Sequence, residues 1–166
     1  MSQTGKAVPQ GFHTLTPHLV VRNADQSIEF YKKAFGAEVI GDVARMPNGK
    51  VMHALLRIGD SNLMLNDEMP EMGALAPSGG GSSVTIHLYT PDVDSTFNRA
   101  TSAGAQVKMP LADQFWGDRY GVVTDPSGHQ WSIAAHVKDL SPDEIQRNMK
   151  ETMAKMPSPQ SQRKTA

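Results

Sequence analysis

Residues of different polarity alternate from His13 to Arg22, which is the period of a β-strand. One side of this strand carries Thr14, Thr16, His18 and Val20, and the other, wholly apolar, carries Leu15, Leu19 and Val21. Residues 23–27 are typical of a turn and helix cap, and an apolar stripe then follows at helical spacing until Gly36. We predict that this helix covers the apolar side of the strand.

Three further extended segments follow the helix, at residues 38–44, 51–58 and 62–66. Turn-forming residues separate them, at 47–49 and at 59–60. The first half of the chain therefore predicts one strand, one helix and three strands, which together make a βαβββ unit.

The same order of elements begins again after Gly81. The later pattern predicts a strand at 83–89, a helix at 92–104, strands at 106–109, 120–124 and 129–136, and a tight turn at 125–128. The sequence TPHL at 16–19 aligns with TIHL at 85–88, and GAEV at 36–39 aligns with GAQV at 104–107. A repeat of about 70 residues predicts two modules of the same structure and an α+β fold.

The repeat sets the expected organisation of the chain. We expect an N-terminal arm at 1–11, one domain at 12–137, a C-terminal helix at 138–156 and a disordered tail at 157–166. Within the domain, module one spans 12–68, a linker spans 69–82 and module two spans 83–137. Ser141 and Pro142 are a typical start for the C-terminal helix.

Composition narrows the function classes. The chain has 166 residues, a formal net charge of -1 and no cysteine, which excludes disulfides, thiolate metal sites and cysteine nucleophiles. Its charges are interspersed, so neither nucleic acid nor an anionic membrane is an expected partner. Without a spanning segment or a secretory pattern, we expect a cytoplasmic protein.

Two βαβββ units, together with SIEFYKKAFGAE at 27–38 and DPSGH at 125–129, resemble the glyoxalase/bleomycin-resistance (vicinal oxygen chelate) superfamily. The segments MHA at 52–54, IGDS at 58–61, MLNDE at 64–68 and HQWSIAAH at 129–136 most resemble its PhnB-like branch. The resemblance implies tandem modules that form a half-closed mixed sheet with a concave ligand cleft, usually in a homodimer. It does not fix a reaction.

The resemblance also implies four metal-ligand positions, which can be tested on this sequence. They fall on Thr16, His53, Thr85 and Ser132. Neutral hydroxyls are poor ligands for a divalent ion, so only His53 would coordinate well. We therefore expect no cofactor, and we interpret these positions as lining a ligand-binding cleft.

A displaced metal site is the alternative. His18 and His87 lie two residues beyond the two threonines and on the same strand faces. With His53 they would supply three imidazoles for zinc, nickel, iron or manganese. The other interpretation, which we favour, is that His18 and His87 are neutral hydrogen-bonding residues of the cleft floor.

Other residues suggest walls of the cleft. Trp116 lies in an aromatic loop at 114–120 that predicts either a pocket wall or a folded loop with an Asp118–Arg119 ion pair. Arg57 shares a strand face with His53 and could meet an anionic group. The remaining assignments are His129 as a brace for the 125–128 turn, His136 as a rim residue, Trp131 as core, and Met52, Met64, Met69 and Met72 as apolar lining or core.

The sequence thus predicts a homodimeric protein that binds a small organic molecule in the cleft, with catalytic residues unknown. Two alternatives stay open. One is a metal-dependent lyase, isomerase or dioxygenase that uses His18, His53 and His87, with Tyr89 or a water moving a proton. The other is a structural dimer whose C-terminal helix recruits another protein.

Overall fold

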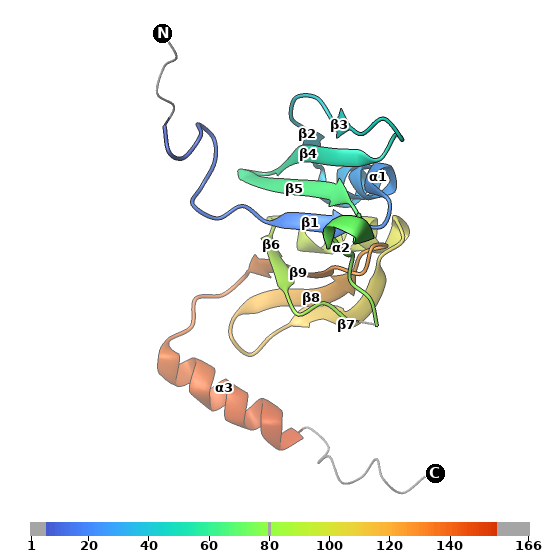
Figure 1. Cartoon of the computed structure of the whole chain (residues 1–166). Helices are drawn as coiled ribbons and strands as arrows, with labels where there is room; N and C mark the ends of the chain where they lie inside the picture. The colour runs from blue at the N-terminus through green and yellow to red at the C-terminus, as the bar shows by residue number, and fades with distance from the viewer. Residues whose placement is uncertain (1–5, 80, 156–166) are drawn as a thin grey trace, which may run out of the picture.

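The computed structural model describes residues 6–79 and 81–155 and contains two βαβββ modules (Figure 1). Module one comprises β1 (His18–Val21), α1 (Ala24–Phe35), β2 (Glu38–Val39), β3 (Ala44–Arg45), β4 (Val51–Ile58) and β5 (Ser61–Asp67). Module two comprises β6 (Thr85–Tyr89), α2 (Val93–Ser102), β7 (Gln106–Asp113), β8 (Asp118–Thr124) and β9 (Gln130–His136). A 3-10 helix, η1 (Pro70–Met72), lies between the modules, and α3 (Pro142–Lys155) follows them. The predicted α+β fold is confirmed.

Both modules have the same sheet topology, which agrees with the internal repeat. The strand orders are β1-β5-β4-β2, with β3 also paired to β4, and β6-β9-β8-β7. In each sheet the first strand runs parallel to the last strand of its module, and the other pairs are antiparallel. Within the part of the chain that the structure describes, β1 and β6 each form a sheet edge and do not pair with one another.

Local sequence explains where the two module helices begin and end. The Asn23 side chain accepts from the amide of Gln26 at 3.0 Å, and Gly36 ends α1 with a left-handed φ of 68°. Asp92 caps α2 in the same way. The helices pack against each other and against the inner strands of both sheets, so the two modules share one core.

Contacts between α1 and module two hold that core together. The Trp131 ring of β9 lies 4.6 Å from the Phe35 ring and 5.4 Å from the Tyr31 ring. The Tyr31 hydroxyl donates to the buried Asp125 carboxylate at 2.6 Å, and the Trp131 indole donates to the same oxygen at 3.1 Å. Trp131 is thus core, as predicted, and the Asp125 turn joins the modules.

Two predicted strands differ most from the structure. β1 begins at His18 because Pro17 lacks an amide proton, and the chain before it leaves the sheet, so Leu15 is 88% exposed. The segment at 38–44 is not one strand, since Gly41 turns the backbone at a φ of 70° and separates β2 from β3. By contrast, β4 matches its predicted range of 51–58, and β7 extends beyond its predicted end to Asp113.

The segments outside the modules are partly ordered. In the predicted linker, η1 forms a short helical turn, and Met69 and Ala76 are buried. Ser141 caps α3 as expected, and Ser141 and Glu144 hydrogen-bond reciprocally; α3 extends away from both sheets in Figure 1. The tail at 157–166, for which the sequence predicted disorder, and the first five residues lie outside the described residues. Among the residues described, no helix is long and apolar enough to cross a membrane.

Candidate ligand-binding site

A groove of about 740 Å³ lies between β1 and β6, the first strands of the two modules. Four of the residues predicted for the cleft line it, and these are Thr16, His18, Thr85 and His87. The linker contributes Leu75 and Pro77. Because the repeat places equivalent residues on β1 and β6, each module supplies one histidine. We call this cavity the seam groove.

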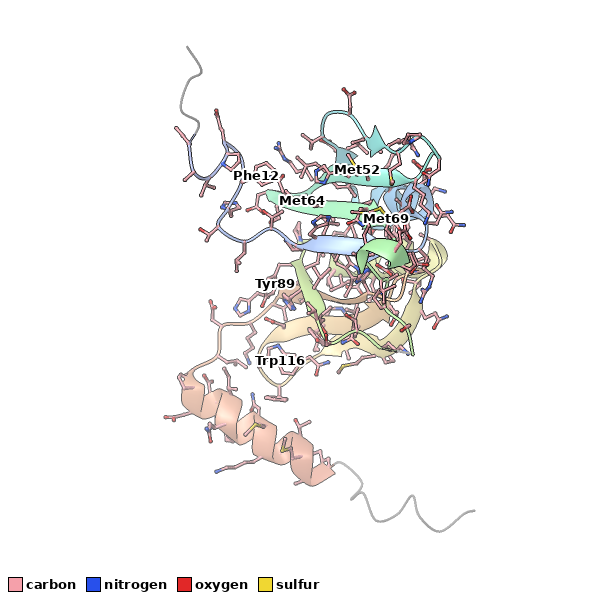
Figure 2. All side chains as sticks on the ribbon, viewed as in Figure 1. Phe12, Met52, Met64, Met69, Tyr89 and Trp116 are labelled. Carbon is pink, nitrogen blue, oxygen red and sulfur yellow. The ribbon has the colours of Figure 1, made fainter. Side chains whose placement is uncertain are left out.

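On the module one side, His18 of the groove lining contacts His53, which lies outside the lining. The rings of His18 on β1 and His53 on β4 lie edge to face, with centroids 6.0 Å apart. Arg57 shares the β4 face of His53, but it lies beside the N-terminal arm. There the Asn62 side chain donates to the Gly11 carbonyl at 2.8 Å, and Figure 2 shows Phe12 of the arm on this side of module one.

On the module two side, His87 of the groove lining belongs to an aromatic wall whose other members do not themselves line the groove. The His87 Nδ1 atom lies 2.7 Å from the Ser132 hydroxyl on β9, and Ser132 is almost fully buried. The Tyr89 ring meets His87 edge-on at 4.4 Å, and the Tyr120 ring stacks at 6.0 Å. Trp116 extends the wall, since its ring lies 5.5 Å from Tyr120. Ser132 therefore orients the imidazole and leaves Nε2 for a bound molecule.

A buried carboxylate supports this wall. Asp118 accepts from the Tyr89 hydroxyl and the Trp116 indole, both at 3.1 Å, and pairs with His136 Nδ1 at 2.7 Å. Burial opposes ionisation of Asp118, but the hydrogen bonds from His136, Trp116 and Tyr89 outweigh it and hold its pKa below the ordinary value. The same hydrogen bond from Tyr89 raises the pKa of that phenol.

These contacts correct one interpretation of the 114–120 loop. Asp118 and Arg119 do not pair, because adjacent residues of β8 point to opposite faces. Arg119 instead binds Asp94 at 2.6 Å and Asp113 at 3.0 Å. The interpretation of 114–120 as a folded loop is therefore wrong in one respect, which is the predicted Asp118–Arg119 ion pair.

Two of the four metal-ligand positions that the resemblance implies carry hydroxyls that already have hydrogen-bond partners. The Ser132 hydroxyl is engaged by His87, and the Thr85 hydroxyl accepts from Gln130 at 2.8 Å. Among residues 6–79 and 81–155, no three His, Asp or Glu side chains are placed to hold a metal ion together. His18 and His53 meet, whereas His87 lies on the opposite side of the groove in this arrangement.

Several other residues lie where sequence reasoning did not place them. The His129 ring crosses to the Val20 carbonyl at 2.9 Å, so it braces β1, and only its backbone amide binds the Asp125 turn. Of the four methionines, only Met69 is buried. The role of Asp118 and the position of Tyr120 were missed, although their two-residue spacing along β8 would have placed both on one face.

Comparisons with known proteins agree with this architecture. A model of the Glyoxalase/Bleomycin resistance protein/Dioxygenase superfamily matches residues 11–133. The chain belongs to this superfamily. The uncharacterised protein Rv0887c of Mycobacterium tuberculosis is 51% identical over 139 residues, covering 81% of this chain and 81% of that protein. Protein YjdN of Escherichia coli is 24% identical and covers 72% of this chain and 92% of its own.

Solved structures of the superfamily show the same fold. The TioX structure from Micromonospora sp. ML1 has a TM-score of 0.59 and 28% sequence identity, covering 75% of this chain and 99% of that chain. A glyoxalase-related enzyme from Fulvimarina pelagi has a TM-score of 0.59 at 20% identity, covering 74% of this chain and 87% of that chain. At this identity the similarity supports the shared fold alone.

Proposed function

We propose that this superfamily member binds a small organic molecule in the seam groove and does not use the family's usual metal site. The observation that carries the proposal is the gathering of Thr16, His18, Thr85 and His87 around one cavity. Its volume lies within the range of small-molecule sites, and its imidazole rings and few hydroxyls are typical of such sites. Hydroxyls at the metal positions favour binding over metal chemistry.

The superfamily's own name supplies the first probes. We would titrate the chain with bleomycin, catechol and the hemithioacetal of methylglyoxal and glutathione, and follow both binding and turnover. Binding without turnover, weakened by His87→Ala, is the expected result for at least one probe. Turnover of catechol or the hemithioacetal would replace the binding proposal with an enzyme.

The edge-to-face pair of His18 and His53 favours one alternative, a metal-dependent lyase, isomerase or dioxygenase with a displaced histidine site. In that case His18, His53 and His87 would hold zinc, nickel, iron or manganese. Elemental analysis of untagged protein purified without chelator decides between the two. About one metal per chain, lost in His53→Ala, would establish the alternative.

Finer features of the proposal are a homodimer, a PhnB-like affiliation and a cytoplasmic location. Exposed apolar side chains on the sheets support the dimer, and they include Met52, Tyr89, Val107 and Met109. A monomer mass in light scattering at about 10 µM would argue against the dimer.

The exposed helix α3 could instead recruit another protein, and deletion of the chain after Lys138 tests that role.

A further inference from the structure

A second cavity, of about 540 Å³, lies where the two modules meet, and both faces of β5 and β6 line it: Leu63 and Leu88 from the core side, Asn62 and His87 from the other. Its apolar floor includes Phe35 and Trp131, and its walls include Leu63 and Leu88. These side chains belong to strand faces and a helix that point into the core, opposite to those of His18 and Ser132. Residues 15–17, Ile86 and His87 line both cavities and so form the boundary between them. We call the second one the inner cavity.

A positive charge without an acidic partner stands at this cavity. Arg99 of α2 lines it and donates to two neutral hydroxyls, Ser95 at 2.9 Å and Thr96 at 3.0 Å. No carboxylate among the described residues forms an ion pair with Arg99, whereas Arg45 and Arg119 are both paired. A guanidinium held by helix hydroxyls beside an apolar cavity is suited to bind a carboxylate.

A buried acceptor in the same lining also lacks a partner. Asn62 is 8% exposed, and its Nδ2 group is fixed by the Gly11 carbonyl, which determines the orientation of the amide. The Oδ1 atom is buried and receives no hydrogen bond from the described residues. Buried acceptors are normally satisfied, so a ligand with an N–H or O–H group would complete this one.

The acidic residue of the cavity lining is Asp60, in the β4–β5 turn. Its carboxylate accepts from the Ser61 hydroxyl at 2.8 Å, and it belongs to module one, whereas Arg99 belongs to module two. A bound acid would therefore direct its carboxylate toward α2 and its N–H or O–H group toward the β4–β5 hairpin.

We propose that the inner cavity is a second binding site, separate from the seam groove, for a small aromatic carboxylic acid that carries an N–H or O–H group. The Phe35 and Trp131 rings, 4.6 Å apart, provide the apolar surface for the ligand ring. The indole of Trp131 already donates to Asp125, so this floor offers no competing polar group.

Indole-3-acetate is the probe, because it combines an aromatic ring, a carboxylate and an N–H group. Isothermal titration of the full chain is expected to show one site per chain. Arg99→Gln should weaken binding at least about tenfold, and so should replacing the probe with neutral indole-3-acetamide. 1-Methylindole-3-acetate, which lacks the N–H donor, should also bind more weakly.

Arg147→Gln is the matched control, since Arg147 is an exposed arginine of α3 that lines neither cavity, and it should leave the affinity unchanged. His18→Ala, which alters only the seam groove, should do the same. The proposal is overturned if indole-3-acetate does not bind at about 5 mM, if Arg147→Gln weakens binding as much as Arg99→Gln, or if His18→Ala abolishes it. Failure of the seam groove to bind any molecule would leave these results unaffected.

Discussion

The Nδ1 atom of His87 lies 2.7 Å from the buried hydroxyl of Ser132, which joins the first and last strands of module two. The contact sets the orientation of the imidazole at the seam groove. In module one, the equivalent histidine, His18, meets the ring of His53 instead. The two halves of an internal repeat thus present different groups to one cavity.

Ser132→Ala removes the partner of the His87 ring. We expect a loss of about 1–2 kcal/mol in the free energy of unfolding, because a part-buried hydrogen bond is lost and the ring nitrogen keeps no partner. Urea denaturation measures the change. Ser61→Ala, which removes only an exposed hydroxyl, should change stability by less than about 0.5 kcal/mol.

Tyr31→Phe tests the link between the modules. The buried hydroxyl donates to Asp125 at 2.6 Å, and burial together with the Asp125 charge raises the pKa of Tyr31 well above the ordinary value, so the phenol stays protonated. Its loss should cost about 1–3 kcal/mol in the free energy of unfolding. Tyr120→Phe is the control in the same denaturation series, and equal effects of the two variants would contradict the assignment.

Gly117→Ala should disrupt the loop that carries Trp116. Gly117 has a φ of 103°, and a Cβ atom there would lie 2.1 Å from the Lys138 carbonyl oxygen. We expect a loss of more than about 2 kcal/mol, with a change in Trp116 fluorescence. Gly49→Ala, at a φ of 85° in open space, should cost only about 1 kcal/mol.

His136 gives the stability of the chain a pH dependence. The hydrogen bonds to Asp118 and Asp139 raise the pKa of His136 in the folded protein. A raised pKa stabilises the fold fully below the unfolded-state pKa, and that contribution is lost as pH rises through the folded-state value. Asp118 acts in the opposite direction, because its pKa is lowered and its contribution is lost in acid.

The shifted pKa values of Asp118 and His136 define one pH range in which the pair stabilises the fold. The His136–Asp118 pair should contribute most between the lowered pKa of Asp118 and the raised pKa of His136. His136→Gln should therefore lower the urea midpoint more near pH 6 than near pH 9. A difference between the two proteins that does not vary with pH would show that His136 contributes only through neutral packing.

Much of the fold follows from local signals. Asn23 starts α1 and Gly36 ends it, because a cap acts on backbone groups within a few residues. The β4 range follows from an apolar run between two turns. The contacts of the candidate site are not local. Asp118 meets His136 because β8 and β9 pair in one register, and sequence alternation gives faces but not register.

Leu15 and His129 show the same limit of prediction from local sequence. Leu15 continues the apolar alternation of β1, yet it is exposed because Pro17 ends the pairing with β5. His129 follows the Asp125 turn in sequence, but its ring reaches Val20 in the other module. Such a contact depends on how the modules pack, which no local pattern encodes.

The most direct test of the seam groove is native mass spectrometry of the full chain after incubation with a cellular small-molecule extract. Thr85→Trp would fill the groove from the exposed end of β6, and Thr101→Trp on α2 is the matched control. We expect an added small-molecule mass that persists in the control and disappears in Thr85→Trp. An added mass retained in both variants, or none in any protein, would contradict the account.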